Sequence, residues 1–292
     1  MHHSIFSILF LLVFTACKNN AFSGSSTEIS GLPDISFPLD EPLVSGHRGC
    51  VGLAGWPENC LETFAHLRRE VPGIIECDVA KTKDGQLILM HDNSVDRTTN
   101  GSGAVANLNW ADLKDLHLKD DDGKLTQYGI PTFGDILNWA KESKTILSVD
   151  IKRSVDHREV IDFIRRYDAQ PYCMIISYSL EQAIDNYTYA PEFYQSVSIR
   201  GHGEFDRWAE RKIPPADRVI AFTGTRRSPP ELYNQLHEEG IPTIFGTFGN
   251  IDEQAAARGP QIYHDLLEGG VDIIATNTPI AAQEAIAGYT RE

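Results

Sequence analysis

The 292-residue sequence is poor in basic side chains: 26 lysines and arginines stand against 41 aspartates and glutamates, which gives a formal net charge of −15. A protein that binds nucleic acid needs a basic face to neutralise phosphates, so this balance argues against a nucleic-acid partner. The acid excess also disfavours broad electrostatic docking on anionic lipid. It is compatible with a small anionic substrate, because a few cations in a cleft can outweigh the field of the whole protein.

Two motifs are also missing. No GxGxxG follows the first expected strand, so a dinucleotide-binding fold has no support. The five cysteines contain no CxxC pair, which argues against a zinc site. In an exported protein Cys50 and Cys60 could form a disulfide, whereas free or buried thiols are the alternative for these two and for Cys77 and Cys173.

The N-terminus contains an apolar run at residues 5–14, interrupted by Ser7. It is too short to span a bilayer, which takes about 20 residues, and is typical of a secretory signal. The run leads into Thr-Ala-Cys, which resembles a bacterial lipoprotein cleavage site. We therefore predict a lipoprotein signal peptide at residues 1–16 and lipid attachment at Cys17. An ordinary secretory signal or a buried strand is the alternative.

Residues 17–40 follow the predicted cleavage site. They are rich in serine, asparagine, glycine and threonine, a composition typical of a flexible tether. Together these features predict an exported bacterial lipoprotein, in the periplasm or at the cell surface, that contacts the membrane through an N-terminal lipid anchor.

Candidate strands and helices alternate from residue 41 to residue 292. Runs rich in β-branched residues predict strands at 43–47, 73–79, 145–151, 173–177, 195–199, 218–222, 242–246 and 271–275. Helical patterns predict helices at 61–70, 133–141, 157–167, 180–187, 204–212, 230–239 and 261–268. Such alternation indicates a parallel sheet, and eight strands over about 250 residues favour a closed (β/α)8 TIM barrel. We expect residues 41–292 to form one such domain.

A hairpin is expected directly after the second barrel strand. Asp84-Gly85 is a favoured dipeptide for a two-residue turn. Such a turn places Asp78 opposite His91, and residues two apart on a strand share a face. Glu76, Asp78 and His91 should therefore converge on one side.

A polar, loop-like insertion follows this hairpin, from about residue 93 to residue 130. One helix is expected near residues 110–116. Long insertions at the active end of a barrel are often functional. The expected fold is thus a TIM barrel with a hairpin-plus-loop insertion after its second strand.

Polar residues cluster where such a barrel has its active site, at the carboxyl ends of the strands. Four segments carry them: Gly46-His47-Arg48-Gly49, Pro57-Glu58-Asn59, Glu76-Cys77-Asp78 with His91-Asp92, and Asp150-Ile151-Lys152. The second segment also fits a plain helix cap, in which Asn59 caps and Glu62 completes a capping box. We expect capping to be at least part of its role.

Three inward carboxylates, Glu76, Asp78 and Asp150, would repel one another strongly if they shared one corner without a cation. Three carboxylate ligands select a hard divalent ion, Mg²⁺ or Ca²⁺. The two nearby histidines can share acid and base work near neutral pH. Arg48 and Lys152 add positive charge suited to phosphate. This combination is typical of a phosphodiester site.

Taken in order, the motifs resemble the glycerophosphodiester phosphodiesterase family. They are Gly-His-Arg-Gly, Pro-Glu-Asn, Glu-x-Asp, Thr-Lys-Asp-Gly, His-Asp and Arg-Thr-Thr-Asn-Gly, between residues 44 and about 152. The resemblance implies a TIM barrel with an insertion and metal-dependent hydrolysis of small glycerophosphodiesters to glycerol 3-phosphate and an alcohol. It implies metal binding by Glu76, Asp78 and Asp150, acid and base roles for His47 and His91, and phosphate contact by Arg48, Glu58 or Lys152.

Several positions depart from the family pattern. Cys60 stands where Thr is usual, Asp150 replaces Glu, Asn277 replaces a late Asp, and a Trp common on the seventh strand is absent, with Phe245 or Phe248 nearby. These changes leave the reaction centre intact and the leaving-group preference open. Four later residues either line the mouth or are plain surface charges: Arg200, His202, Arg226 and Arg227.

Two rival functions share these residues. The first is a lipid phosphodiesterase on the same barrel, of the phospholipase D-like or phosphoinositide-lyase type. A large apolar rim around the mouth would favour it, whereas a narrow polar cleft would favour deacylated substrates. The second is a non-catalytic surface binding protein, which would hold its ligand without turnover even when Mg²⁺ or Ca²⁺ is supplied.

Overall fold

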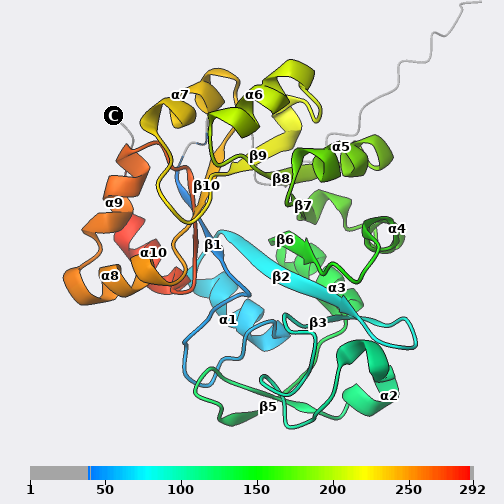
Figure 1. Cartoon of the computed structure of the whole chain (residues 1–292). Helices are drawn as coiled ribbons and strands as arrows, with labels where there is room; N and C mark the ends of the chain where they lie inside the picture. Colours follow the sequence, from blue (N-terminus) through cyan, green and yellow to red (C-terminus); the bar gives the residue numbers. More distant parts are fainter. Residues whose placement is uncertain (1–38, 40, 290–292) are drawn as a thin grey trace, which may run out of the picture. The chain divides into compact units, whose positions relative to one another are not determined.

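The computed structural model describes residue 39 and residues 41–289 (Figure 1). The predicted signal peptide, Cys17 and most of the predicted tether lie outside these residues. In the described part of the chain, no helix combines the length and the apolar character that crossing a bilayer requires.

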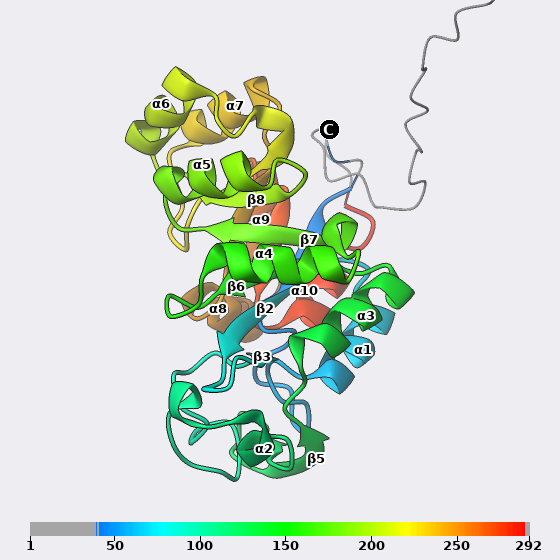
Figure 2. The ribbon, with the colours of Figure 1, turned by 90° about the vertical axis from the view of Figure 1, so that its right-hand side faces the viewer.

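Eight parallel strands form a closed barrel, as predicted (Figures 1 and 2). They are β1 (Leu43–Gly46), β2 (Ile74–Lys81), β6 (Ile146–Ile151), β7 (Cys173–Ser177), β8 (Tyr194–Ser198), β9 (Val219–Phe222), β10 (Thr243–Gly246) and β11 (Ile273–Thr276). Neighbouring strands pair in sequence order, and β1 pairs with both β11 and β2, which closes the ring. The alternation of β-branched runs with helices therefore produces the predicted closed barrel of parallel strands.

Helices surround the barrel on its outside (Figure 1). They are α1 (Leu61–Glu70), α3 (Phe133–Ser143), α4 (His157–Arg166), α5 (Leu180–Tyr189), α6 (His202–Arg211), α7 (Pro230–Glu238), α8 (Asn250–Arg258), α9 (Gln261–Glu268) and α10 (Pro279–Ile286). α4 illustrates why they form: Asp156 caps its first turn, and Val160, Ile161 and Ile164 bury one face. Neither α8 nor α10 was predicted from the sequence.

The barrel interior is filled from its amino-terminal end by bulky side chains. Buried residues of this layer are Ile74, Ile146, Met174, Ile220, Ile244 and Ile273. Two residues further along β6, the inward side chain is Ser148 instead of an aliphatic one. The core is therefore dense at one end of the barrel and open at the carboxyl end, where the polar residues lie.

The insertion after β2 packs around its own small core beside the barrel (Figure 2). Its elements are β3 (Leu87–Leu89), a 3-10 helix (Val105–Asn107), α2 (Trp110–Leu113), β4 (His117–Lys119) and β5 (Leu125–Gly129). The predicted helix is present but is short, and the β4–β5 hairpin was not predicted.

The predicted hairpin register is wrong by one residue. Val79 pairs with Leu89, so Asp78 lies opposite Met90, whose backbone N–H donates to the Asp78 carbonyl at 3.0 Å. A shift of one residue would turn His91 to the other face if the ladder continued. β3 ends at Leu89, however, and His91 lies beyond the ladder, from where it still reaches the barrel mouth.

The register differs because Asp84-Gly85 belongs to a three-residue loop. The Thr82 N–H donates to the Gln86 carbonyl at 3.0 Å, and Gly85 adopts a φ of +88°. The Thr82 hydroxyl donates to Asp84 at 2.5 Å and accepts from the Gln86 N–H. A turn followed by a left-handed glycine is the usual three-residue hairpin loop, and Asp-Gly suits it as well as the two-residue turn.

Barrel closure depends on Gly73, which lies where β1 and β2 meet. A Cβ at this position would lie 2.0 Å from the Val44 carbonyl oxygen. We expect Gly73→Ala to lower the free energy of unfolding by about 1–3 kcal/mol, the usual cost of overpacking, as measured by urea denaturation. Gly203→Ala is the matched control, because its Cβ meets only the end of a flexible arginine within a helix. Equal stability of the two variants would contradict this account.

Candidate active site

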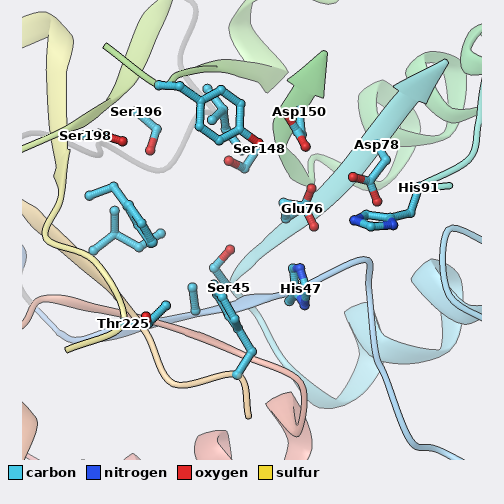
Figure 3. A pocket seen from close by; sticks show the side chains of 16 residues that line it. Ser45, His47, Glu76, Asp78, His91, Ser148, Asp150, Ser196, Ser198 and Thr225 are labelled. Carbon is cyan, nitrogen blue, oxygen red and sulfur yellow. The ribbon is translucent and has the colours of Figure 1, made fainter. Parts of the chain in front are cut away.

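A cavity of about 320 Å³ opens at the carboxyl ends of the barrel strands (Figure 3). Five residues singled out in the sequence line it: His47, Glu76, Asp78, His91 and Asp150. Three others, Arg48, Glu58 and Lys152, form ion pairs that connect to this group. Segments between residues 47 and 152 are therefore brought together at one end of the barrel.

The carboxylates of Glu76, Asp78 and Asp150 form one acidic corner. One oxygen from each lies within 4.8 Å of the other two. Period-two alternation puts Glu76 and Asp78 on the same face of β2, and the pairing of β2 with β6 places Asp78 level with Asp150. Asp150 Oδ1 is buried and has no hydrogen-bond partner among the described residues. An oxygen-only donor set with a spare buried oxygen fits a hard divalent cation.

Burial and neighbouring charges shift the pKa values of the carboxyl groups in this corner. Burial, and then the charges of Asp78 and Asp150, raise the pKa of Glu76 well above its usual range. Burial acts on Asp78 in the same direction, but Lys152 outweighs it and lowers the pKa of Asp78. The Lys152 ammonium lies 2.5 Å from Asp78 Oδ1 and 3.1 Å from Asp150 Oδ2. A divalent cation bound here would favour the ionised form of Glu76, so the raised pKa of Glu76 is compatible with a cation site.

Asn59 points into this corner and does not cap helix α1, so the predicted capping role is wrong. Its Nδ2 donates to Asp78 Oδ2 at 2.6 Å, and its Oδ1 accepts from the Asp78 N–H at 2.9 Å. A left-handed backbone conformation, with φ of 52°, turns Asn59 inward. The residue at the N-cap position is Cys60, which makes no capping hydrogen bond. Asn59 thus fixes the orientation of the Asp78 carboxylate.

Arg48 lies between two carboxylates. Its backbone N–H donates to Glu76 at 2.7 Å, and its guanidinium contacts the buried Glu58 at 3.3 Å. The Nε atom is 3.7 Å from Asp78 Oδ2 and has no hydrogen bond among the described residues. A guanidinium that still has a free donor at the edge of the acidic corner is suited to bind an anionic oxygen.

The insertion contributes Arg97, which the sequence analysis did not single out although it stands in the Arg-Thr-Thr-Asn-Gly motif. Arg97 forms two hydrogen bonds with Glu58, at 2.8 and 2.9 Å, and its Nε donates to Asp92 at 2.7 Å. Asp92 Oδ1 in turn lies 2.8 Å from Nδ1 of His91. Arg97 is the main cause of the lowered pKa of Asp92. The chain Glu58–Arg97–Asp92 therefore holds an ionised carboxylate against His91.

His47 has a neutral partner instead. Its Nδ1 lies 2.7 Å from Asn277 Oδ1, and its ring stacks on Phe248 with a centroid distance of 4.5 Å. The Asn277 N–H donates to the buried Asp252 of α8 at 2.9 Å, which holds the loop in place. Burial lowers the pKa of His47, and the hydrogen bond to Asn277 opposes this only in part. Phe245, the other aromatic residue considered for this region, is buried in the core between barrel and helices.

Other residues considered in the sequence do not join the site. Arg200, His202, Arg226 and Arg227 are not among the residues that line the cavity. Arg200 forms an ion pair with Glu204, which is typical of a helix-surface charge. Cys50, Cys60, Cys77 and Cys173 are free and buried, so the disulfide alternative is not observed.

Comparisons with known proteins agree with this geometry. The model of the glycerophosphoryl diester phosphodiesterase family matches residues 47–168. A glycerophosphodiester phosphodiesterase of Caldanaerobacter subterraneus is 30% identical over 143 residues, which span 47% of this chain and 58% of that protein. The crystal structure of a glycerophosphoryl diester phosphodiesterase from Parabacteroides distasonis superposes with a TM-score of 0.78 at 32% identity, covering 86% of this chain and 88% of that one.

A more distant structure shares the fold. It is a phosphodiesterase from Oleispira antarctica in complex with the product sn-glycerol-3-phosphate. Its TM-score is 0.68 at 18% identity, over 85% of this chain and 98% of that chain.

The environment of His47 has a measurable consequence. In chelator-treated protein, the NMR titration midpoint of the His47 ring should lie below the ordinary histidine value of about 6.5. Asn277→Asp should raise this midpoint, because a carboxylate stabilises the charged imidazolium, whereas Asn277→Ala should lower it further. A midpoint that is the same in all three proteins would show that Asn277 does not contact His47 in solution.

Proposed function

Because this chain belongs to the glycerophosphoryl diester phosphodiesterase family, we propose that it hydrolyses glycerophosphodiesters to glycerol 3-phosphate and an alcohol. One observation carries the proposal: three carboxylates, two histidines, an arginine and a lysine surround or adjoin a single cavity. Together these groups can bind an anionic ester and transfer the protons that its cleavage requires.

Glu76, Asp78 and Asp150 would hold the divalent cation, Mg²⁺ or Ca²⁺. When bound, it would supply Lewis-acid neutralisation of the charge on the phosphate oxygens. Arg48 and Lys152 lie beside the same corner. We propose that they bind the phosphate oxygens and neutralise the charge that the cation leaves. Glu58 supports this role indirectly, because it holds the Arg48 guanidinium.

His47 is the better candidate for the general base. Its Nδ1 faces the Asn277 carbonyl oxygen, which favours the tautomer with the proton on Nδ1. The Nε2 lone pair is then available to take a proton from the attacking oxygen, either water or the neighbouring glycerol hydroxyl. The lowered pKa of His47 keeps the ring neutral at pH 7, as a base requires.

His91 is the better candidate for the general acid. Its Nδ1 lies 2.8 Å from Oδ1 of Asp92, so the carboxylate orients the ring and leaves Nε2 for proton transfer. As the phosphorus–oxygen bond breaks, the ring gives its Nε2 proton to the departing alkoxide. At the end of the step His47 has gained a proton and His91 has lost one. Transfer of one proton from His47 to His91, directly or through solvent, restores both rings.

Deacylated substrates fit this site better than intact lipid. Among the described residues, the exposed large hydrophobic side chains are Leu125, Tyr178 and Ile213, and of these Tyr178 alone lines the cavity. A phosphodiesterase that acts on membrane lipid needs a larger apolar surface around its mouth.

For the N-terminus, we propose the lipoprotein arrangement: signal peptide 1–16, lipid on Cys17 and a tether that holds the barrel near a membrane outside the cytoplasm. The apolar run followed by Thr-Ala-Cys supports it.

The activity can be tested with a panel of glycerophosphodiesters and intact phospholipids. We expect release of glycerol 3-phosphate from the diesters, loss of that release with chelator, and recovery with Mg²⁺ or Ca²⁺. Cleavage that ignores chelator would contradict the metal site. Faster cleavage of intact lipid would favour the lipid phosphodiesterase, and binding without turnover would favour a binding protein.

If His47 is the base and His91 is the acid, the effect of replacing each histidine on kcat/KM should depend differently on the leaving group. His91→Ala should lower kcat/KM by about 10² or more on glycerophosphoethanolamine, and far less on a p-nitrophenyl diester, whose phenolate leaves without a proton. Arg97→Met should also lower kcat/KM more on glycerophosphoethanolamine than on the p-nitrophenyl diester, but by less than His91→Ala, because Arg97 acts on His91 through Asp92. His47→Ala should reduce both reactions alike, and His117→Ala, outside the cavity, should reduce neither. If His47→Ala instead shows the loss that depends on the leaving group and His91→Ala reduces both reactions alike, His47 is the acid and His91 is the base.

A further inference from the structure

Tyr178 lies beside Asp150 in the wall of the cavity. Strands β6 and β7 pair in parallel, with Ser148 level with Met174. Residues two apart on a strand share a face, so the next inward residues are Asp150 after Ser148, and Ile176 and then Tyr178 after Met174. Asp150, Ile176 and Tyr178 all line the cavity, as this alternation requires. Tyr178 is therefore a neighbour of Asp150 on the adjacent strand, one inward step nearer the mouth.

The phenol of Tyr178 interacts with the Asp150 carboxylate. Burial, and then the charge of Asp150 and a hydrogen bond to it, raise the pKa of the phenol. Because an ionised carboxylate has no proton to give, the phenol is the donor in this hydrogen bond.

Two of the three carboxylates in the acidic corner have an orienting donor from a neutral group. Asp78 Oδ2 accepts from the Asn59 side chain at 2.6 Å, and Glu76 accepts from the Arg48 backbone N–H at 2.7 Å. Carboxylates that ligate metals are usually hydrogen-bonded in this way, and these outer partners contribute to metal affinity.

Asp150 needs a corresponding donor. Lys152 Nζ lies 3.1 Å from Asp150 Oδ2, but it lies closer to Asp78, at 2.5 Å from Oδ1. Asp150 therefore shares the lysine with a second carboxylate. Tyr178 supplies the neutral donor that Asn59 supplies to Asp78.

The backbone around Tyr178 is held from behind by α5 and α4. Gln182 Oε1 of α5 accepts from the Tyr178 N–H at 2.8 Å. Since this bond uses the amide oxygen, the Gln182 amide nitrogen faces Nε2 of His157, the first residue of α4, at 2.8 Å. Burial lowers the pKa of His157, which keeps the ring neutral and able to accept from this amide. Asn186 of α5 also donates to the hydroxyl of the preceding residue, Ser177, at 3.1 Å.

We propose that Tyr178 is a positioning residue for Asp150, and that Gln182 and His157 hold Tyr178 in place. The phenol hydroxyl restricts rotation of the Asp150 carboxylate, so less ordering is needed when a cation binds. This inference rests on the proposed cation site, and it adds residues outside that site which set its affinity.

Contact with the substrate alone is the alternative role for Tyr178. Its side chain is 55% exposed and lines the cavity, so the ring can also pack against a ligand. Packing needs the ring, whereas positioning of Asp150 needs the hydroxyl. Tyr178→Phe keeps the ring and removes the hydroxyl, so it separates the two roles.

Cation affinity without substrate is the direct measurement. By calorimetry with Mg²⁺ and with Ca²⁺, we expect Tyr178→Phe to weaken binding about 10-fold, as for other residues that orient metal ligands. Gln182→Met should weaken it by less, because it acts through Tyr178. Tyr128→Phe, outside the cavity, and Gln254→Met, whose amide bonds to Asn250 of its own helix, are matched controls and should leave the affinity unchanged. Cation binding by Tyr178→Phe as tight as by the wild type would overturn the proposal.

A second measurement does not depend on a cation. In chelator, the urea midpoints of Tyr178→Phe, Asp150→Ala and the double variant complete a double-mutant cycle. We expect the midpoint shift caused by Tyr178→Phe to disappear in the Asp150→Ala background, because the phenol has lost its acceptor. Equal shifts in both backgrounds would show that Tyr178 does not position Asp150, even if diesters are cleaved. If the wild type binds no cation or cleaves no diester, the proposed function fails, and the cycle still decides whether Tyr178 positions Asp150.

Discussion

Repulsion among three carboxylates at one end of the barrel is the constraint on which the site depends. Glu76, Asp78 and Asp150 lie within 4.8 Å of one another in a largely buried corner, where charges are poorly screened. Lys152 and Arg48 reduce the repulsion from the side, and the repulsion that remains, together with burial, raises the pKa of Glu76. The corner could hold a divalent cation. In the function proposed above, that cation would let an acidic protein receive an anionic substrate locally.

The two histidines differ because their partners differ. His47 is backed by a neutral amide from the last barrel loop, and that loop is held by the buried Asp252. His91 is backed by a carboxylate, which Arg97 of the insertion keeps ionised. The two histidines therefore have partners of different charge, one neutral and one anionic. The insertion is part of the site because it supplies one of these two supports.

The size of the inward-facing side chains changes along the barrel axis, and this change determines where the barrel has space for a ligand. A dense aliphatic layer fills the amino-terminal end of the barrel. Small serines in that upper layer leave a cavity beside the acidic corner. The lower layer of the barrel is therefore packed, whereas the upper layer leaves space for a ligand.

The sequence predicts the barrel, because alternating strands and helices with inward period-two residues leave few other folds, and it identifies most polar groups at the strand ends. It did not determine the hairpin register, since Asp84-Gly85 suits loops of two or three residues. It missed α8, whose one buried residue is the polar Asp252, so no apolar stripe marks it. Only the tertiary structure paired His47 with Asn277, which are 230 residues apart, because contacts across a closing barrel leave no local pattern in the chain.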